Sequence, residues 1–379
     1  MKKILLASLA LSPLYLTTQS IHAEKFTLAI MGDPQYNWSC SSEGSNAGKS
    51  DYCTSTSKQK NEAEDSNNKT IDEINKIKSN KDNNYKGLII NGDLTAFGHE
   101  DERKRFQKFY NIKDFKTMIY PALGNHDYQN NINDCGAKYT QGWNNCAGGM
   151  MHLMADWILG YKGLDKGKAH GCNPLLKSCD IYAFNKNTAQ TTGNRNVIGS
   201  LAYSWEINEF LFVQLQNYPH YTTDFKRGWD SGVSSWTMKA QNSMAWLTIQ
   251  LNDAKKKKQH VILNMHNIEY YFGEGAKTEK DTEQRRFDRI QLENVLKEYS
   301  PNIRAIFVGH HHQEIGISKS RHSEIAGIPI IYSGSPISGR LLKVKFDVSD
   351  SKNCIDINKV TTTKDGIESL KKISCPVLN

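Results

Sequence analysis

Short apolar runs alternate with helical patterns along most of the chain. Apolar runs at residues 26–31, 87–91 and 117–123 predict three strands. Between them, apolar positions recur at helical spacing over residues 69–79 and 102–110, which predicts two helices. Regular alternation of strands and helices is typical of an α/β fold, so an all-β or all-α architecture is disfavoured.

The second half of the chain has more antiparallel character. Residues 202–207 and 210–216 predict a hairpin, and helices are expected over residues 240–254 and 285–299. The remaining apolar runs predict strands at residues 261–265, 304–308, 328–332 and 341–346. We expect the last two of these strands to complete a second sheet.

Two long polar stretches, residues 37–67 and 128–200, interrupt this alternation. Long loops in compact domains are usually functional or disordered, and four cysteines in the second stretch favour order. Both are interpreted as inserts that form walls or a lid over the site, or that only cover sheet edges. Their aromatic residues would stack on a substrate or pack the inserts themselves; these are Trp38, Trp143 and Trp157.

The N-terminus has the pattern of a secretory signal peptide. Lys2 and Lys3 precede an apolar run over residues 4–16, and cleavage is predicted after Ala23. The apolar run is too short for a membrane span. The sequence therefore predicts a secreted or periplasmic protein. We expect a main domain over residues 24–348 and a C-terminal, disulfide-tied extension over residues 349–379.

Composition narrows the class of protein. The chain has 38% hydrophobic and 23% charged residues, which is ordinary for a globular protein and excludes a fibrous chain. Its net charge of +8 favours anionic ligands, and a phospholipid surface is one candidate partner. No nucleic-acid-binding module is evident, and the oligomeric state is left open.

Eight cysteines in an exported chain predict disulfides. A cysteine zinc site is disfavoured because no two cysteines have the C-x-x-C spacing. The cysteines fall into neighbouring couples, so local pairing is expected, as Cys40–Cys53, Cys135–Cys146, Cys172–Cys179 and Cys354–Cys375.

Polar side chains follow five of the predicted strands. Each motif alone fits an ordinary turn, because Gly, Asn and Asp favour turns. In open α/β sheets, however, ligands bind beyond the carboxyl ends of the strands, so these groups are expected to converge. Carboxylates, amides and imidazoles suit first-row metal ions, and the groups are too numerous for one tetrahedral zinc. Two metals sharing a carboxylate would use them all.

The five motifs are Gly32-Asp33-Pro34-Gln35, Gly92-Asp93, Gly124-Asn125-His126-Asp127, Met265-His266 and Gly309-His310-His311-His312. They resemble the motifs of the calcineurin-like metallophosphoesterase superfamily. The resemblance spans residues 25–346. Trp246-Leu247 also resembles the helix before the fourth motif in purple acid phosphatase-like members, and acid sphingomyelinase-like members have a similar set. The family fold implied is a four-layer αββα sandwich with two mixed β-sheets and its metal site at the strand C-terminal ends.

The resemblance also implies roles for individual residues. The first metal would be bound by Asp33 and His312, the second by Asn125, His266 and His310, and both by Asp93. His126 would lie beside the phosphate as a catalytic residue, and Asp127 would hold the ring of His126.

Two positions depart from the family pattern. Gln35 stands where many members have histidine, so it is a weaker candidate ligand for the first metal. Ala96 stands where purple acid phosphatases have a metal-binding tyrosine. We therefore expect no iron–tyrosinate colour.

The expected activity is hydrolysis of phosphate esters by a metal-bound hydroxide, with Fe, Zn or Mn as the two metals. A phosphatase is favoured over a phosphodiesterase of the phospholipase C or sphingomyelinase type. A non-catalytic binding protein on the same scaffold is the alternative from another class. It is disfavoured because only one ligand position departs from the pattern.

Overall fold

The computed structural model describes residues 24–35, 57–111, 118–132, 145–160, 172–186, 195–227, 236–362 and 367–378. Several predictions concern residues outside these ranges. They are the signal peptide over residues 1–23, the first part of the insert at residues 37–67, and the positions of Trp38, Cys40, Cys53, Cys135 and Trp143.

The first of two large sheets contains the predicted N-terminal strands. Its order is β18-β17-β16-β1-β2-β3, in which β1, β2 and β3 run parallel. All six residues of β1 are buried, which accounts for its continuous apolar sequence. The strands are β1 (Phe26–Met31), β2 (Tyr85–Ile90), β3 (Ile119–Pro121), β16 (Arg340–Phe346), β17 (Ile355–Thr361) and β18 (Ile367–Ile373).

The second large sheet has eight strands. Its order is β13-β15-β12-β11-β8-β7-β4, with β14 paired to β15. Strands β8, β11, β12 and β15 are parallel, and the predicted hairpin of β7 and β8 is confirmed. The strands are β4 (Ser178–Cys179), β7 (Tyr203–Ile207), β8 (Phe210–Gln214), β11 (His260–Met265), β12 (Ile303–Val308), β13 (Ile315–Gly316), β14 (Glu324–Ile325) and β15 (Ile328–Ser333).

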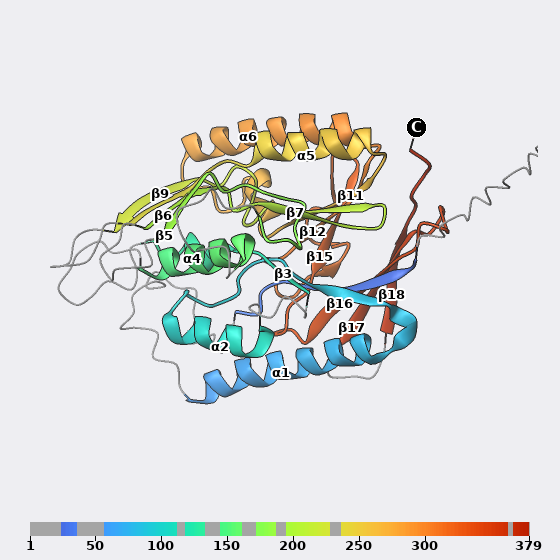
Figure 1. Cartoon of the computed structure of the whole chain (residues 1–379), viewed down its shortest axis with the longest axis horizontal. Helices are drawn as coiled ribbons and strands as arrows, with labels where there is room; N and C mark the ends of the chain where they lie inside the picture. Colours follow the sequence, from blue (N-terminus) through green and yellow to red (C-terminus); the bar gives the residue numbers. More distant parts are fainter. Residues whose placement is uncertain are drawn as a thin grey trace, which may run out of the picture.

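Helices cover the outer faces of the two sheets. Figure 1 shows α1 (Ser57–Ser79) and α2 (Glu100–Tyr110) along one side of the molecule, and α5 (Met244–Lys256) and α6 (Glu279–Tyr299) along the other. The predicted helix–sheet–sheet–helix sandwich is thus confirmed. The described part of the chain also contains short helices, namely η1 (Lys81–Asn83), α3 (Asn125–Tyr128) and η3 (Ile268–Phe272).

Aromatic side chains join the two sheets. The ring of Phe26 in β1 stacks on that of Phe346 in β16 at 4.8 Å between centroids. From the opposite sheet, Phe210 lies 5.0 Å from Phe346, and Phe212 lies 5.4 Å from it. All four rings are buried. Strands of both sheets are therefore held face to face by one aromatic cluster.

Strand β16 corrects one prediction. It was expected to complete the second sheet, but it pairs antiparallel with β1 in the first, with Phe346 opposite Phe26. The chain order suggested otherwise because β16 directly follows β15. Pairing between the two ends of the chain leaves no local signal in the sequence. Strands β17 and β18 extend the same sheet, so the residues after 348 continue the first sheet.

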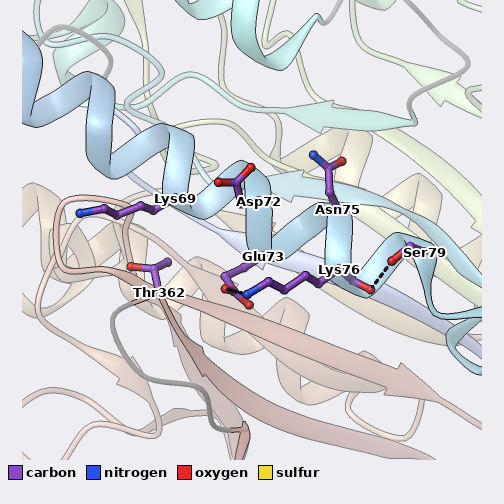
Figure 2. A pocket seen from close by; sticks show the side chains of 7 residues that line it. All are labelled: Lys69, Asp72, Glu73, Asn75, Lys76, Ser79 and Thr362. Atoms are coloured by element: carbon purple, nitrogen blue, oxygen red, sulfur yellow. Dashed lines mark hydrogen bonds and ion pairs between the residues drawn. The ribbon is translucent and has the colours of Figure 1, made fainter.

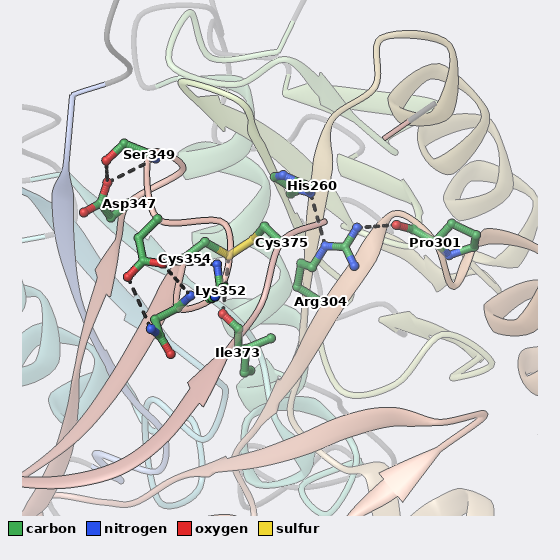
Figure 3. Close-up of a disulfide and its surroundings, with 11 residues drawn as sticks. His260, Pro301, Arg304, Asp347, Ser349, Lys352, Cys354, Ile373 and Cys375 are labelled. Carbon is green, nitrogen blue, oxygen red and sulfur yellow. Dashed lines mark hydrogen bonds between the residues drawn. A yellow bond between two sulfur atoms is a disulfide. The ribbon is translucent and has the colours of Figure 1, made fainter. Parts of the chain in front are cut away.

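Two predicted disulfides are confirmed, Cys172–Cys179 and Cys354–Cys375. Figure 3 shows the second one tying the C-terminal segment to the first sheet, beside the turn that contains Asp347 and Ser349. The other two predicted pairs involve residues outside the described part.

Among the described helices, none has the length and apolarity to cross a membrane.

The two predicted inserts contain regular structure. Residues 57–67 belong to α1, where buried Asn67 donates to the carbonyl of Pro34 at 3.1 Å. This long-range contact anchors a polar sequence of weak helical pattern. On the solvent side, Figure 2 shows charged residues of α1 around a hollow beside Thr362, with Lys76 and Glu73 paired at 2.7 Å. That face is an ordinary solvated helix surface.

Within the predicted insert at 128–200, α4 (Asn145–Leu159) contributes to the core. Its Trp157 is buried, 4.9 Å from the ring of Tyr203. Trp157 therefore packs inside the protein rather than standing free to stack on a substrate.

A four-stranded sheet was not predicted. Its order is β5-β6-β10-β9, with β6 and β10 parallel. Its strands are β5 (Ala183–Lys186), β6 (Arg195–Gly199), β9 (Thr223–Arg227) and β10 (Trp236–Ala240).

We expect Phe346→Ala to destabilise the fold by about 3–5 kcal/mol, because it opens a cavity where the two sheets meet. Urea unfolding of the chain from residue 24 onward measures this change. Phe287→Ala is the matched control, since Phe287 on α6 is 56% exposed and should change stability by at most about 0.5 kcal/mol. Equal effects of the two substitutions would contradict the assigned packing.

Candidate metal centre

Five strands deliver polar side chains to one edge of the sandwich. Asp33 follows β1, Asp93 follows β2, and Asn125 begins α3 after β3. From the other sheet, His266 follows β11, and His310 follows β12. Because β1, β2 and β3 are parallel, as are β11 and β12, their carboxyl ends meet at this edge.

Glycines permit the close approach of these strand ends. A Cβ at Gly124 would lie 2.2 Å from Oδ1 of Asp93. At Gly309 it would lie 2.3 Å from the carbonyl oxygen of Asn91 and 2.9 Å from Nδ1 of His266. No real Cβ atom tolerates such distances. The glycines of the motifs are therefore a packing requirement of the site.

The side chains form two groups of potential ligands. Atoms of Asp93, His266 and His310 lie within 4.8 Å of one another, and so do atoms of Asp33, Asp93 and His312. Asp93 is common to both groups. Each distance is short enough for one ion to contact all three members of a group, and the two groups adjoin at one carboxylate.

His266 is oriented for ligation through Nε2. Its Nδ1 lies 2.8 Å from the carbonyl oxygen of Asn91, which can only accept, so Nδ1 carries the proton. Its Nε2 lies 2.8 Å from Oδ1 of Asn125 and 3.2 Å from Oδ2 of Asp93. The lone pair of a neutral ring then points at the two oxygens, which is the arrangement a shared cation requires.

Nδ1 of His310 completes this convergence, 3.0 Å from the same Oδ1 of Asn125. Its backbone N–H donates to both carboxylate oxygens of Asp33 at 3.0 Å. Burial and the charge of His266 hold the pKa of His310 well below its ordinary value. The ring is thus neutral, as a metal ligand must be.

The buried charges of the site favour a cation. Burial raises the pKa of Asp33 well above its ordinary value, and the charge of Asp93 adds to this effect. Burial acts in the same direction on Asp93, but the charges of His266 and His126 hold its pKa below the ordinary value. Burial would also lower the pKa of His266, yet the charge of Asp93 raises it to about 9. A bound cation would take the place of that proton.

Gln35 is directed toward the same point. Its Nε2 donates to Oδ2 of Asp93 at 3.0 Å, and its φ of 34° lies in the left-handed region. Its Oε1 is buried and has no hydrogen-bond partner among the described residues. A buried amide oxygen without a partner is costly, and a cation would satisfy it. The residues present therefore fit a metal, with Gln35 as an available oxygen ligand.

Nδ1 of His126 lies 2.9 Å from the carbonyl oxygen of Ala96, which holds the ring. Its backbone N–H donates to Oδ1 of Asp93 at 2.9 Å, so His126 adjoins both ligand groups. Asp127 was expected to hold the ring of His126, but its oxygens accept from the backbone N–H groups of Leu94, Thr95 and Gly124. Asp127 thus fixes the loop that carries Ala96.

Backbone carbonyl groups near the site have a role that the sequence does not reveal. The carbonyl groups of Asn91 and Ala96 orient two of the site's histidines, yet every residue has a carbonyl, so no residue type marks them. Burial and the charge of Asp93 raise the pKa of Asp127 to about 7, although the hydrogen bonds that its carboxylate accepts act to lower the pKa. The ring of His220, after β8, contacts Tyr271 at 2.9 Å and Gln291 at 3.1 Å.

Comparison with known proteins gives the family. A model of the calcineurin-like phosphoesterase family matches residues 26–314, a span that contains all five motifs. The chain belongs to this family. No curated protein sequence matches this calcineurin-like phosphoesterase.

Solved structures resemble this calcineurin-like phosphoesterase at low identity. A dimetal phosphatase from Danio rerio is 12% identical, with a TM-score of 0.44, over 91% of this chain and 99% of that one. The sulfate thiohydrolase SoxB of Thermus thermophilus, in complex with glycerol, is 10% identical. It has a TM-score of 0.39 over 93% of this chain and 56% of that one.

Gln35→His should tighten metal binding by roughly tenfold, about 1.4 kcal/mol, because an imidazole nitrogen is a better ligand for first-row metals than an amide oxygen. Competition against a chromogenic chelator measures the affinity for zinc. Gln35→Leu, which keeps the bulk without a ligand, should weaken binding or leave it unchanged. If Gln35→His and Gln35→Leu bind zinc equally, Gln35 does not face the metal.

Proposed function

We propose that this calcineurin-like phosphoesterase is an exported, two-metal hydrolase of phosphate esters that acts as a phosphatase. The observation that carries the proposal is Asp93, which belongs to both ligand groups and can bridge two cations. Two ions roughly 3.5–4 Å apart suit in-line displacement at phosphorus. The family match supports the reaction class, and the disulfides support export, since disulfides form in oxidising compartments.

In the proposed site, Asp33, His312 and Gln35 hold the first cation, and Asn125, His266 and His310 hold the second. When bound, the pair of cations would supply Lewis acidity and an activated water. The identity of the ions, Fe, Zn or Mn, is part of the proposal.

His126 is proposed to act on the phosphate itself. Because Nδ1 donates to the carbonyl of Ala96, Nε2 is the nitrogen that gains and loses a proton. A protonated Nε2 can donate to a phosphate oxygen or protonate the leaving oxygen as a general acid. Asp127 is a positioning residue, because it holds the loop of Leu94 and Thr95 that leads to Ala96.

We expect His126→Ala to lower kcat by about 10²–10⁴-fold while the protein keeps its metal, because the residue acts on the substrate rather than on the ions. Asp93→Ala should lose both activity and metal. Metal content by mass spectrometry, measured beside turnover, separates the two roles. Equal loss of metal in both variants would exclude the proposed division.

The monoester para-nitrophenyl phosphate and its bis-para-nitrophenyl diester distinguish the phosphatase from the alternative phosphodiesterase. The protein is loaded separately with Mn, Zn or Fe, and Asp93→Ala serves as the blank. We expect metal-dependent turnover with the monoester preferred. Preference for the diester would favour a phosphodiesterase, for which phospholipid vesicles are the next substrate. No turnover and no bound metal would indicate a non-catalytic binding scaffold.

A further inference from the structure

A second cluster of potential ligands includes His311, which lies between His310 and His312 on the loop after β12. Atoms of Glu269, Glu274 and His311 lie within 4.8 Å of one another. His322 joins them, with its Nε2 3.6 Å from Oε2 of Glu269 and 4.0 Å from Oε1 of Glu274. Two imidazoles and two carboxylates therefore face one point outside the metal centre described above.

The spacing of these atoms suits a tetrahedral ion. Zinc–nitrogen and zinc–oxygen bonds of about 2.0–2.2 Å place neighbouring ligand atoms about 3.4 Å apart. Nε2 of His322 lies 3.6 Å from Oε2 of Glu269, close to that edge length. A direct hydrogen bond between a charged imidazole and a carboxylate would be shorter, at about 2.7–2.9 Å. The groups surround a small space rather than closing on each other.

Unpaired buried atoms point to what that space accepts. The side chain of Glu269 is 3% exposed, and its Oε2 has no hydrogen-bond partner among the described residues. Nε2 of His311 is likewise buried without a hydrogen-bond partner there. A buried polar atom without a hydrogen-bond partner is costly. A cation between the two would satisfy both.

Neighbouring residues hold the four side chains in this arrangement. The hydroxyl of Tyr332 donates to Oε1 of Glu269 at 2.6 Å, which leaves Oε2 for another partner. Arg321 contacts Oε2 of Glu274 at 2.6 Å, which leaves its Oε1 toward His322. The His322 ring stacks on Phe272 at 3.4 Å between centroids. Such outer contacts are typical of metal ligands.

We propose that Glu269, Glu274, His311 and His322 form a separate binding site for a divalent first-row cation of the zinc type. The two carboxylates exceed the single positive charge of Arg321, and the donor set suits zinc. Glu274 and His322 are 42% and 38% exposed, so the ion can enter from solvent. The proposal does not depend on the phosphoesterase activity.

An ion at this site would join three segments. Glu269 lies in η3 after His266, His311 lies between His310 and His312, and His322 precedes β14. Two of these segments also carry ligands of the dimetal centre. The ion would therefore fix the loop after β12, with a structural rather than a chemical role.

Zinc titration of the mature chain tests the proposal, with bound metal counted by mass spectrometry. His322→Ala should bind one zinc fewer than the wild type. The same loss of one zinc should appear when His322→Ala is added to Asp93→Ala, whose dimetal centre is disrupted. Glu274→Gln is a second variant of the same site. The side chains of His322 and Glu274 are both partly exposed, so either variant should fold. Glu324→Gln, on neighbouring β14 and exposed, is the control and should lose no zinc.

Zinc should also raise the melting temperature of Asp93→Ala, and adding His322→Ala should abolish that shift. Anomalous diffraction at the zinc edge should place a peak between Glu269 and His322. Equal zinc content with and without His322, in both backgrounds, would overturn the proposal. A peak confined to the centre of Asp93 would overturn it as well.

Discussion

The structure depends on bringing the ends of five strands from two facing sheets within bonding distance of common ions. Gly32 shows how tight this convergence is, since a Cβ there would lie 2.9 Å from the Cα of Gly309 on the other sheet. The aromatic cluster around Phe346 keeps the sheets at a distance that allows this contact. Packing far from the site thereby sets the separation of its ligands.

The same convergence buries charge that the protein alone compensates poorly. Asp33, Asp93 and Asp127 are all at most 1% exposed at one edge of the sandwich. Asp127 is satisfied by backbone N–H groups, whereas Asp33 and Asp93 face histidines. Asp33, Asp93 and His310 also have φ values of 53°, 52° and 73°, and strained backbone of this kind is concentrated at functional sites. Bound cations would offset the free-energy cost of both the buried charge and the strained backbone.

Sequence reasoning succeeded where a pattern is local. Buried strands such as β1 and β11 are continuous apolar runs, and each ends directly before a polar motif. The candidate ligands were found for that reason, and the structure brings them together. Pairs of cysteines close in the sequence, such as Cys172 and Cys179, were equally accessible.

Non-local features were missed. The place of β16 depends on pairing between strands near the two ends of the chain. Likewise, β6 pairs with β10 across more than thirty intervening residues, so neither pairing has a local signal in the sequence. The partners of Asp127 and His126 are backbone groups, which no residue type identifies. The cluster of Glu269 and His322 was overlooked because its members are spread over three segments without a shared motif.

The central claim is that two ions share Asp93 at the junction of the two sheets. Anomalous diffraction from crystals of the chain from residue 24 onward, soaked in Mn or Zn, tests it most directly. Apart from any peak at the cluster of Glu269 and His322, we predict two peaks roughly 3.5–4 Å apart, one beside Asp33 and His312 and one beside His266 and His310, with Asp93 between them. A single peak, or none within reach of Asp93, would contradict it.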